Sequence, residues 1–98
     1  MGQVRWTEEA ERWLREIHDY IARDNPEAAL RTARGIYDKI DSLSAFPERG
    51  YPHTSKSGRP LRIILFGHYR IAYTVNHDKD VTVLGVFHGA LDIDRYLP

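Results

Sequence analysis

Two residues in the last third of the chain, Arg70 and His88, have side chains suited to contacting a phosphate group. Each lies among apolar neighbours in a strand-like run, the first spanning 69–75 and the second 81–88. The polar five-residue connection between the runs has a length compatible with a β-hairpin. If the runs pair from that connection outward, Arg70 and His88 are diagonal neighbours on one face, with β-carbons roughly 7–8 Å apart. We therefore expect both side chains to reach the same phosphate.

The other face of this predicted hairpin is expected to be the core face. Side chains alternate along a strand, so apolar residues gather on the face away from Arg70. They are Tyr69, Ile71, Tyr73, Val75, Val81, Val83 and Phe87. We expect helices to cover this face and to leave the opposite face free for function.

The composition is that of a small globular domain. A length of 98 residues, 42% of them hydrophobic and 29% charged, predicts one domain over 1–98 with a single core. The chain has no cysteine, which excludes disulfides and favours a reducing cytoplasm. We expect neither a signal peptide nor a membrane-spanning segment. No pair of histidines has helical metal spacing and the glycines form no phosphate loop, so no metal and no cofactor is predicted.

The net charge is zero, but the charges are unevenly distributed along the chain. Between positions 49 and 70 there are five Lys/Arg and two His and no acid, whereas the rest of the chain has nine basic and fourteen acidic residues. This asymmetry favours a surface for an acidic partner, either nucleic acid or an acidic protein segment. A solvated basic loop is the alternative interpretation.

Apolar residues at three- and four-residue spacing predict two consecutive amphipathic helices. The first begins after Thr7, a suitable N-cap, and runs to about Arg23. The second begins at Pro26, with Asn25 as its cap, and stops near Phe46. Because the connection between them is so short, we expect an antiparallel helical hairpin.

Strands are predicted on both sides of the helices, at 3–7, at 61–66 and in the two runs described above. The segment 47–60 contains several prolines and glycines and is predicted to be a loop, and 92–97 is predicted to be a short helical tail. The element order β-α-α-β-β-β predicts an α+β domain. In it the helical hairpin packs on one face of an antiparallel β-sheet.

This order of elements, together with particular residues, resembles the RelE/ParE superfamily of toxins from type II toxin–antitoxin modules. The matching segments are Asp24–Ala29, Phe46–Gly50, Pro60–Arg62, Tyr69–Tyr73 and Val83–Asp92. They extend over nearly the whole chain, and their order and spacing are more specific together than any one is alone. The resemblance implies one of two activities, ribosome-dependent cleavage of messenger RNA or inhibition of DNA gyrase. A shared fold does not decide between them.

The RelE-like alternative, an mRNA endoribonuclease, assigns catalysis to Arg70 and His88. Cleavage through the RNA 2′-hydroxyl needs proton transfer and cations around the phosphorane. The resemblance implies that Arg70 grips phosphate and that His88 transfers protons. The chain departs from the nuclease pattern because Leu61 and Ile63 stand where RelE has lysines. Tyr96 is the candidate for the terminal tyrosine of such nucleases. With those cations missing, we expect weak or partner-assisted cleavage at most.

The ParE-like alternative is favoured by the end of the chain. The run His88-Gly89-Ala90-Leu91-Asp92 follows a ParE-like pattern in which His88 is structural, bonded to Asp92 or to backbone. The resemblance then implies a plasmid-stabilisation toxin that inhibits growth by docking on gyrase. The residues predicted to bind phosphate or a partner are Arg49, Arg59, Arg62, Arg70 and Tyr96. A degenerate, non-toxic family member is a third alternative.

Either activity implies a protein partner. The resemblance predicts a cognate antitoxin whose acidic or amphipathic segment wraps the helices and the basic face. A cytoplasmic location without membrane association is expected from the absence of cysteine and of a membrane-spanning segment. The assembly is left open between a homodimer and a toxin–antitoxin heterotetramer.

Overall fold

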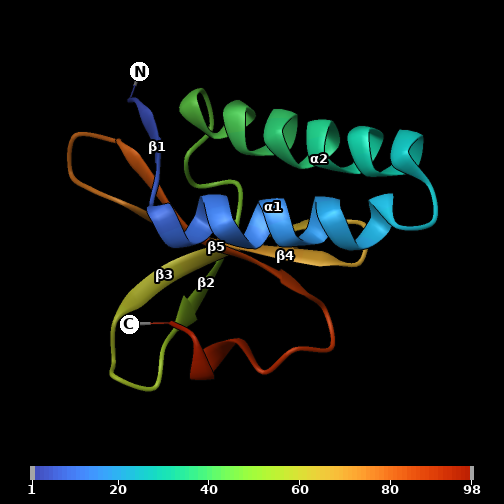
Figure 1. The fold of residues 1–98 in the computed structure, drawn as a ribbon. Helices are drawn as coiled ribbons and strands as arrows, with labels where there is room; N and C mark the ends of the chain where they lie inside the picture. Colours follow the sequence, from blue (N-terminus) through green and yellow to red (C-terminus); the bar gives the residue numbers. More distant parts are fainter. Residues whose placement is uncertain (1, 98) are drawn as a thin grey trace.

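The computed structural model describes residues 2–97, which form two α-helices and a five-stranded sheet (Figure 1). In chain order the elements are β1 (Val4–Trp6), α1 (Glu8–Ala22), α2 (Pro26–Asp41), the 3₁₀ turn η1 (Ser42–Ser44), β2 (Tyr51–Thr54), β3 (Pro60–Phe66), β4 (Tyr69–Val75), β5 (Val81–His88) and the 3₁₀ turn η2 (Ile93–Arg95). Figure 1 shows both helices on one side of the sheet and the C-terminal segment on the other. The predicted α+β class is therefore confirmed.

The strands lie in the order β1-β5-β4-β3-β2. Strands β2 to β5 are antiparallel to their neighbours, whereas β1 runs parallel to β5. The sheet is thus mixed, and the prediction of a wholly antiparallel sheet is wrong at its first strand. A second correction concerns β2, which lies inside the segment predicted to be a loop. Pro52 can occupy β2 because this is an edge strand, where a missing N–H need not interrupt the hydrogen-bond ladder.

Both helices begin where the capping residues predict. The Thr7 side-chain oxygen accepts a hydrogen bond from the Ala10 amide at 3.0 Å, and Asn25 Oδ1 accepts one from the Ala28 amide at 3.0 Å. These bonds satisfy amides that have no partner inside the first turn. Helix α2 ends earlier than predicted, because the chain tightens into η1 directly after Asp41.

The sheet has an apolar cluster on each face. The cluster toward the helices contains Ala10, Ile36, Ile40, Leu43, Ile64, Ile71, Tyr73, Val81, Val83 and Val86. The cluster on the second face contains Leu61, Ile63, Ala72, Phe87 and Ile93. Trp13 of α1 packs against both clusters. The helix-covered face is thus close to the predicted one, except that Val86 occupies it in place of Phe87.

The C-terminal segment covers much of the second face. Ile93 is buried there, and the Tyr96 ring stacks on Phe87 with centroids 6.2 Å apart. His53 Nε2 of β2 lies 3.0 Å from Asp94 Oδ1, which joins η2 to the edge of the sheet. The face that was expected to be bare is therefore occupied by the end of the chain itself.

Candidate functional site

A β-bulge in β5 changes the strand pairing on which the predicted site depends. Near the hairpin connection the residues pair one to one as far as Tyr73 with Val83. The next pair is Ala72 with Gly85, so that Leu84 is an extra residue in β5. One inserted residue reverses the face that all later side chains of the strand occupy, relative to the partner strand.

Beyond the bulge, Arg70 pairs with Phe87 and Tyr69 pairs with His88. Directly paired residues share a face, and adjacent residues alternate between faces. Arg70 and His88 therefore lie on opposite faces of the sheet. The prediction that they are diagonal neighbours on one face is wrong, because the alternation of residue types does not reveal the inserted residue.

Arg70 is held against the C-terminal segment. Its Nη2 donates a hydrogen bond to the Leu91 carbonyl oxygen at 2.6 Å. Its Nε is buried and has no hydrogen-bond partner within residues 2–97. The guanidinium thus ties the tail to the second face of the sheet, and it is only partly exposed. The hydrogen bond from Arg70 to Leu91 therefore helps to hold the C-terminal segment in place.

His88 lies at the end of β5 on the opposite face and is exposed. Its ring packs edge-on against Tyr69, with centroids 5.9 Å apart. Its Nδ1 accepts a hydrogen bond from the Ala90 amide at 3.3 Å. Of the two predicted partners, backbone or Asp92, the backbone is the one found.

The other predicted binding residues do not gather around Arg70. Arg62 Nη1 donates to the Gly50 carbonyl at 2.6 Å, so this side chain supports a loop. Arg59 lines a separate recess that also contains Tyr96, whose ring contacts Trp13 edge-on at 5.3 Å between centroids. The side chains at the two positions where RelE has lysines, Leu61 and Ile63, are buried in the second cluster.

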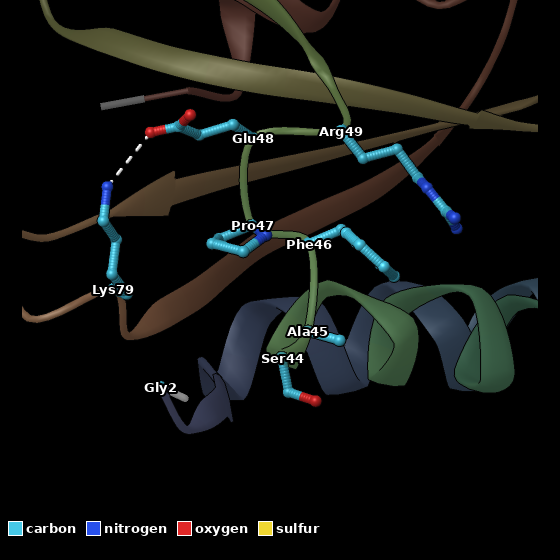
Figure 2. A pocket seen from close by; sticks show the side chains of 8 residues that line it. All are labelled: Gly2, Ser44, Ala45, Phe46, Pro47, Glu48, Arg49 and Lys79. Atoms are coloured by element: carbon cyan, nitrogen blue, oxygen red, sulfur yellow. Dashed lines mark hydrogen bonds and ion pairs between the residues drawn. The ribbon is translucent and has the colours of Figure 1, made fainter.

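A recess that the sequence prediction missed lies beside the connection between η1 and β2 (Figure 2). We call it the 44–49 recess; its volume is about 610 Å³, and it is lined by Gly2, Ser44, Ala45, Phe46, Pro47, Glu48, Arg49 and Lys79. Figure 2 shows Glu48 and Lys79 at one side and Phe46 and Arg49 at the other. Of these residues only Arg49 was a predicted binding residue. The sequence signal for this segment is the motif Phe46–Gly50.

Charged groups border the 44–49 recess on both sides. Lys79 Nζ lies 3.1 Å from Glu48 Oε1, and this hydrogen bond, with the lysine charge, lowers the pKa of the Glu48 carboxyl. On the other side of the 46–49 backbone, the Arg49 guanidinium carbon lies 5.3 Å from the centroid of the Phe46 ring, in cation–π contact (Figure 2). The Phe46 side chain is 60% exposed.

Two side chains of the sheet fix the backbone beside the recess. The Tyr73 hydroxyl donates to the Pro47 carbonyl oxygen and accepts from the Gly50 amide, both at 2.8 Å. Arg62 Nη1 donates to the carbonyl oxygens of Gly50 and Glu48 at 2.6 and 3.3 Å. Burial raises the pKa of Tyr73, which keeps its hydroxyl protonated and able to donate.

The helical hairpin exposes several large apolar side chains. Its large exposed side chains are Tyr20, Leu30 and Tyr37, with exposed fractions of 72%, 57% and 56%. Tyr37 stacks on Trp6 with centroids 5.8 Å apart, beside a recess of about 360 Å³ that Leu14 also lines. We call the exposed side chains of Tyr20, Leu30 and Tyr37 the hairpin surface.

Two kinds of feature are absent from the described part of the chain. Within residues 2–97, no group of three or more His, Asp or Glu side chains is arranged to hold a metal ion. Neither helix in that range has the length and apolar content that spanning a bilayer requires.

The family is shown by comparison with known proteins. The profile described as the ParE toxin of the type II toxin–antitoxin system parDE matches residues 4–93. The chain therefore belongs to the ParE toxin family, within the RelE/ParE superfamily, and is a toxin of the type II toxin–antitoxin class. It is 38% identical over 86 residues to the toxin-class protein Y4kP of Sinorhizobium fredii, covering 88% of this chain and 86% of that one.

Other similar proteins come from both branches of the superfamily. Toxin RelE2 of Caulobacter vibrioides is 46% identical over 50 residues, which is 51% of this chain and 57% of that protein. The chromosomal ParDE system of P. aeruginosa gives a TM-score of 0.71 at 23% identity, over 90% of this chain and 96% of that one. The RelBE2 toxin–antitoxin complex of Mycobacterium tuberculosis gives a TM-score of 0.60 at 21% identity, over 89% of this chain and 96% of that chain. These structural likenesses confirm the fold.

Proposed function

We propose that this toxin arrests growth by binding DNA gyrase and that it does so without cleaving RNA. The observation that carries the proposal is the separation of Arg70 from His88 by the bulge at Leu84. In RNA cleavage, the proton-transfer group and the phosphate-binding cation must act on the same phosphodiester. A binding inhibitor has no such requirement.

The surroundings of Arg70 support the same proposal. Its guanidinium is already bonded to the Leu91 carbonyl, and the neighbouring positions on its face are the apolar residues Phe87 and Ala72. A phosphate brought to this guanidinium would have to displace the tail and would meet an apolar cluster. Such an environment offers little stabilisation to a phosphorane anion.

A supercoiling assay tests the proposal directly. Purified toxin is titrated into gyrase holoenzyme with relaxed plasmid and ATP, and the supercoiled product is measured on a gel. We expect inhibition, and we expect no new cleavage sites when the same toxin is added to translating ribosomes. Transcripts cut at the ribosome together with uninhibited gyrase would instead identify a RelE-like nuclease.

We further propose that the antitoxin binds the hairpin surface. Leu30 and Tyr37 are exposed on α2 and line a common recess, and Tyr37 also borders the recess that contains Trp6. Exposed apolar side chains beside such recesses suit an amphipathic partner segment. The structural neighbours from P. aeruginosa and M. tuberculosis are described as a toxin–antitoxin system and complex, which supports a partner of this kind.

Leu30→Asp is expected to weaken antitoxin binding at least about tenfold, because it puts a charge into an apolar contact. Calorimetric titration of the variant with an antitoxin encoded beside the toxin gives the affinity. Leu65→Asp is the matched control, since Leu65 is similarly exposed at 55% but lies in β3, away from the helices. Equal affinities for Leu30→Asp and the wild type would place the antitoxin elsewhere.

A further inference from the structure

Phe46 and Arg49 give the 44–49 recess the composition of a binding hot spot. Aromatic residues and arginine contribute most to the affinity of protein interfaces, especially beside a pocket that a partner can fill. Phe46 is 60% exposed and the Arg49 guanidinium lies across its ring. An exposed aromatic ring of this kind gains by being covered, because its apolar area leaves water.

The recess is already formed in the free protein. Its backbone is fixed through the Tyr73 and Arg62 hydrogen bonds to residues 47–50, and Tyr73 itself is fully buried. The loop therefore loses little conformational freedom when a partner binds, which favours affinity. These hydrogen bonds satisfy backbone groups of the loop on the side that faces the sheet. The side chains of the loop are therefore what a partner would contact.

The charges around the recess indicate the chemistry of its occupant. The Arg49 guanidinium donates to Ser42 Oγ at 3.3 Å, but within residues 2–97 no carboxylate forms an ion pair with it. Lys79 and Glu48 compensate each other at the opposite side. Among the described residues that line the recess, the Arg49 cation thus has no carboxylate partner, and it lies beside the apolar residues Ala45, Phe46 and Pro47. An apolar side chain next to a carboxylate would complement this arrangement.

The recess is separate from the surface proposed for the antitoxin. None of its lining residues belongs to the hairpin surface or lines the recess of about 360 Å³ beside Tyr37. A ligand in the 44–49 recess and a ligand on the helices therefore have different contact residues.

We infer that the 44–49 recess is the docking site for the target of the toxin, and that it receives an acidic segment of that protein with an apolar side chain inserted beside Phe46. The inference rests on the proposed function, in which the target is gyrase. It predicts that contacts with the target and with the antitoxin can be lost independently of each other.

The test compares gyrase inhibition and antitoxin affinity in the same variants. Arg49→Glu and Phe46→Ala are each expected to raise the toxin concentration for half-maximal inhibition of gyrase holoenzyme at least about tenfold. Antitoxin affinity should stay within about twofold of the wild type. Arg23→Glu makes the same charge change at an exposed turn, and Leu65→Ala truncates another exposed apolar side chain; both should inhibit like the wild type.

Each result decides the inference. Unchanged gyrase inhibition by both Arg49→Glu and Phe46→Ala would overturn it and leave the proposed function intact. If the wild type itself fails to inhibit gyrase, both are overturned. Parallel loss of antitoxin binding would also overturn it, because the surfaces would not be separate. Thermal unfolding of each variant excludes misfolding, and Arg49→Gln, a milder change, should show the same effect in smaller measure.

Discussion

Phe87→Ala is expected to lower the free energy of unfolding by about 3–5 kcal/mol, because it empties the centre of the second cluster. Phe87 is 1% exposed, and its ring lies between Trp13, at 4.9 Å between centroids, and Tyr96. For a domain of this size each kcal/mol corresponds to roughly 4–8 °C in melting temperature. Thermal or urea unfolding, followed by circular dichroism, measures the loss.

Phe46→Ala is the matched control for this prediction, since it removes the same atoms from an exposed position. We expect it to change stability by no more than about 0.5 kcal/mol. Similar losses for the two variants would mean that the tail does not pack on the sheet through Phe87. The second face would then be open, as the sequence alone suggested.

Gly50→Ala is expected to destabilise the protein by about 2–4 kcal/mol, from overpacking and from loss of a buried hydrogen bond. A β-carbon at this position would lie 2.7 Å from the Tyr73 hydroxyl and 2.8 Å from the Ile63 carbonyl oxygen. Tyr73 would have to withdraw, and its bond to the Gly50 amide would be lost. Because the loop then loses its support, the proposed inhibition of gyrase should weaken together with stability.

Two further variants separate the causes. Tyr73→Phe removes the hydroxyl without adding volume and should cost about 1–3 kcal/mol, because the buried Gly50 amide loses its partner. Gly58→Ala adds a methyl group in open space, so it causes no overpacking. Because φ at this position is 84°, backbone strain alone should lower the free energy of unfolding by about 1–2 kcal/mol. A Gly50→Ala protein as stable as the wild type would show that the loop is not packed on Tyr73.

Much of the fold follows from local sequence signals. The caps at Thr7 and Asn25 and the apolar stripes are properties of single helices, and each can be read without knowing the rest of the chain. The pairing of strands that are distant in sequence is harder to predict. The parallel contact of β1 with β5 depends on where the helical hairpin returns the chain, and β2 contains a proline that argues against a strand unless its edge position is known.

The sequence does not predict how the candidate residues are arranged in space. Arg70 and His88 both lie on neighbouring strands, as expected, and a single inserted residue, Leu84, puts them on different faces. Alternation over a run such as Val83–His88 is compatible with either register, because nearly all of its residues are apolar. The 44–49 recess was missed for another reason, since it is built from three segments that are distant in sequence.

A toxin that acts by binding, as proposed, does not need the pair Arg70 and His88, and His88→Ala is the variant that decides this. Arg70 is less suitable, because its loss would also release the tail at Leu91. His88 is exposed and its substitution should leave the fold intact. We predict that cells expressing His88→Ala without antitoxin stop growing at the same inducer concentration as cells expressing the wild type. A stably folded His88→Ala protein that permits normal growth would contradict the claim.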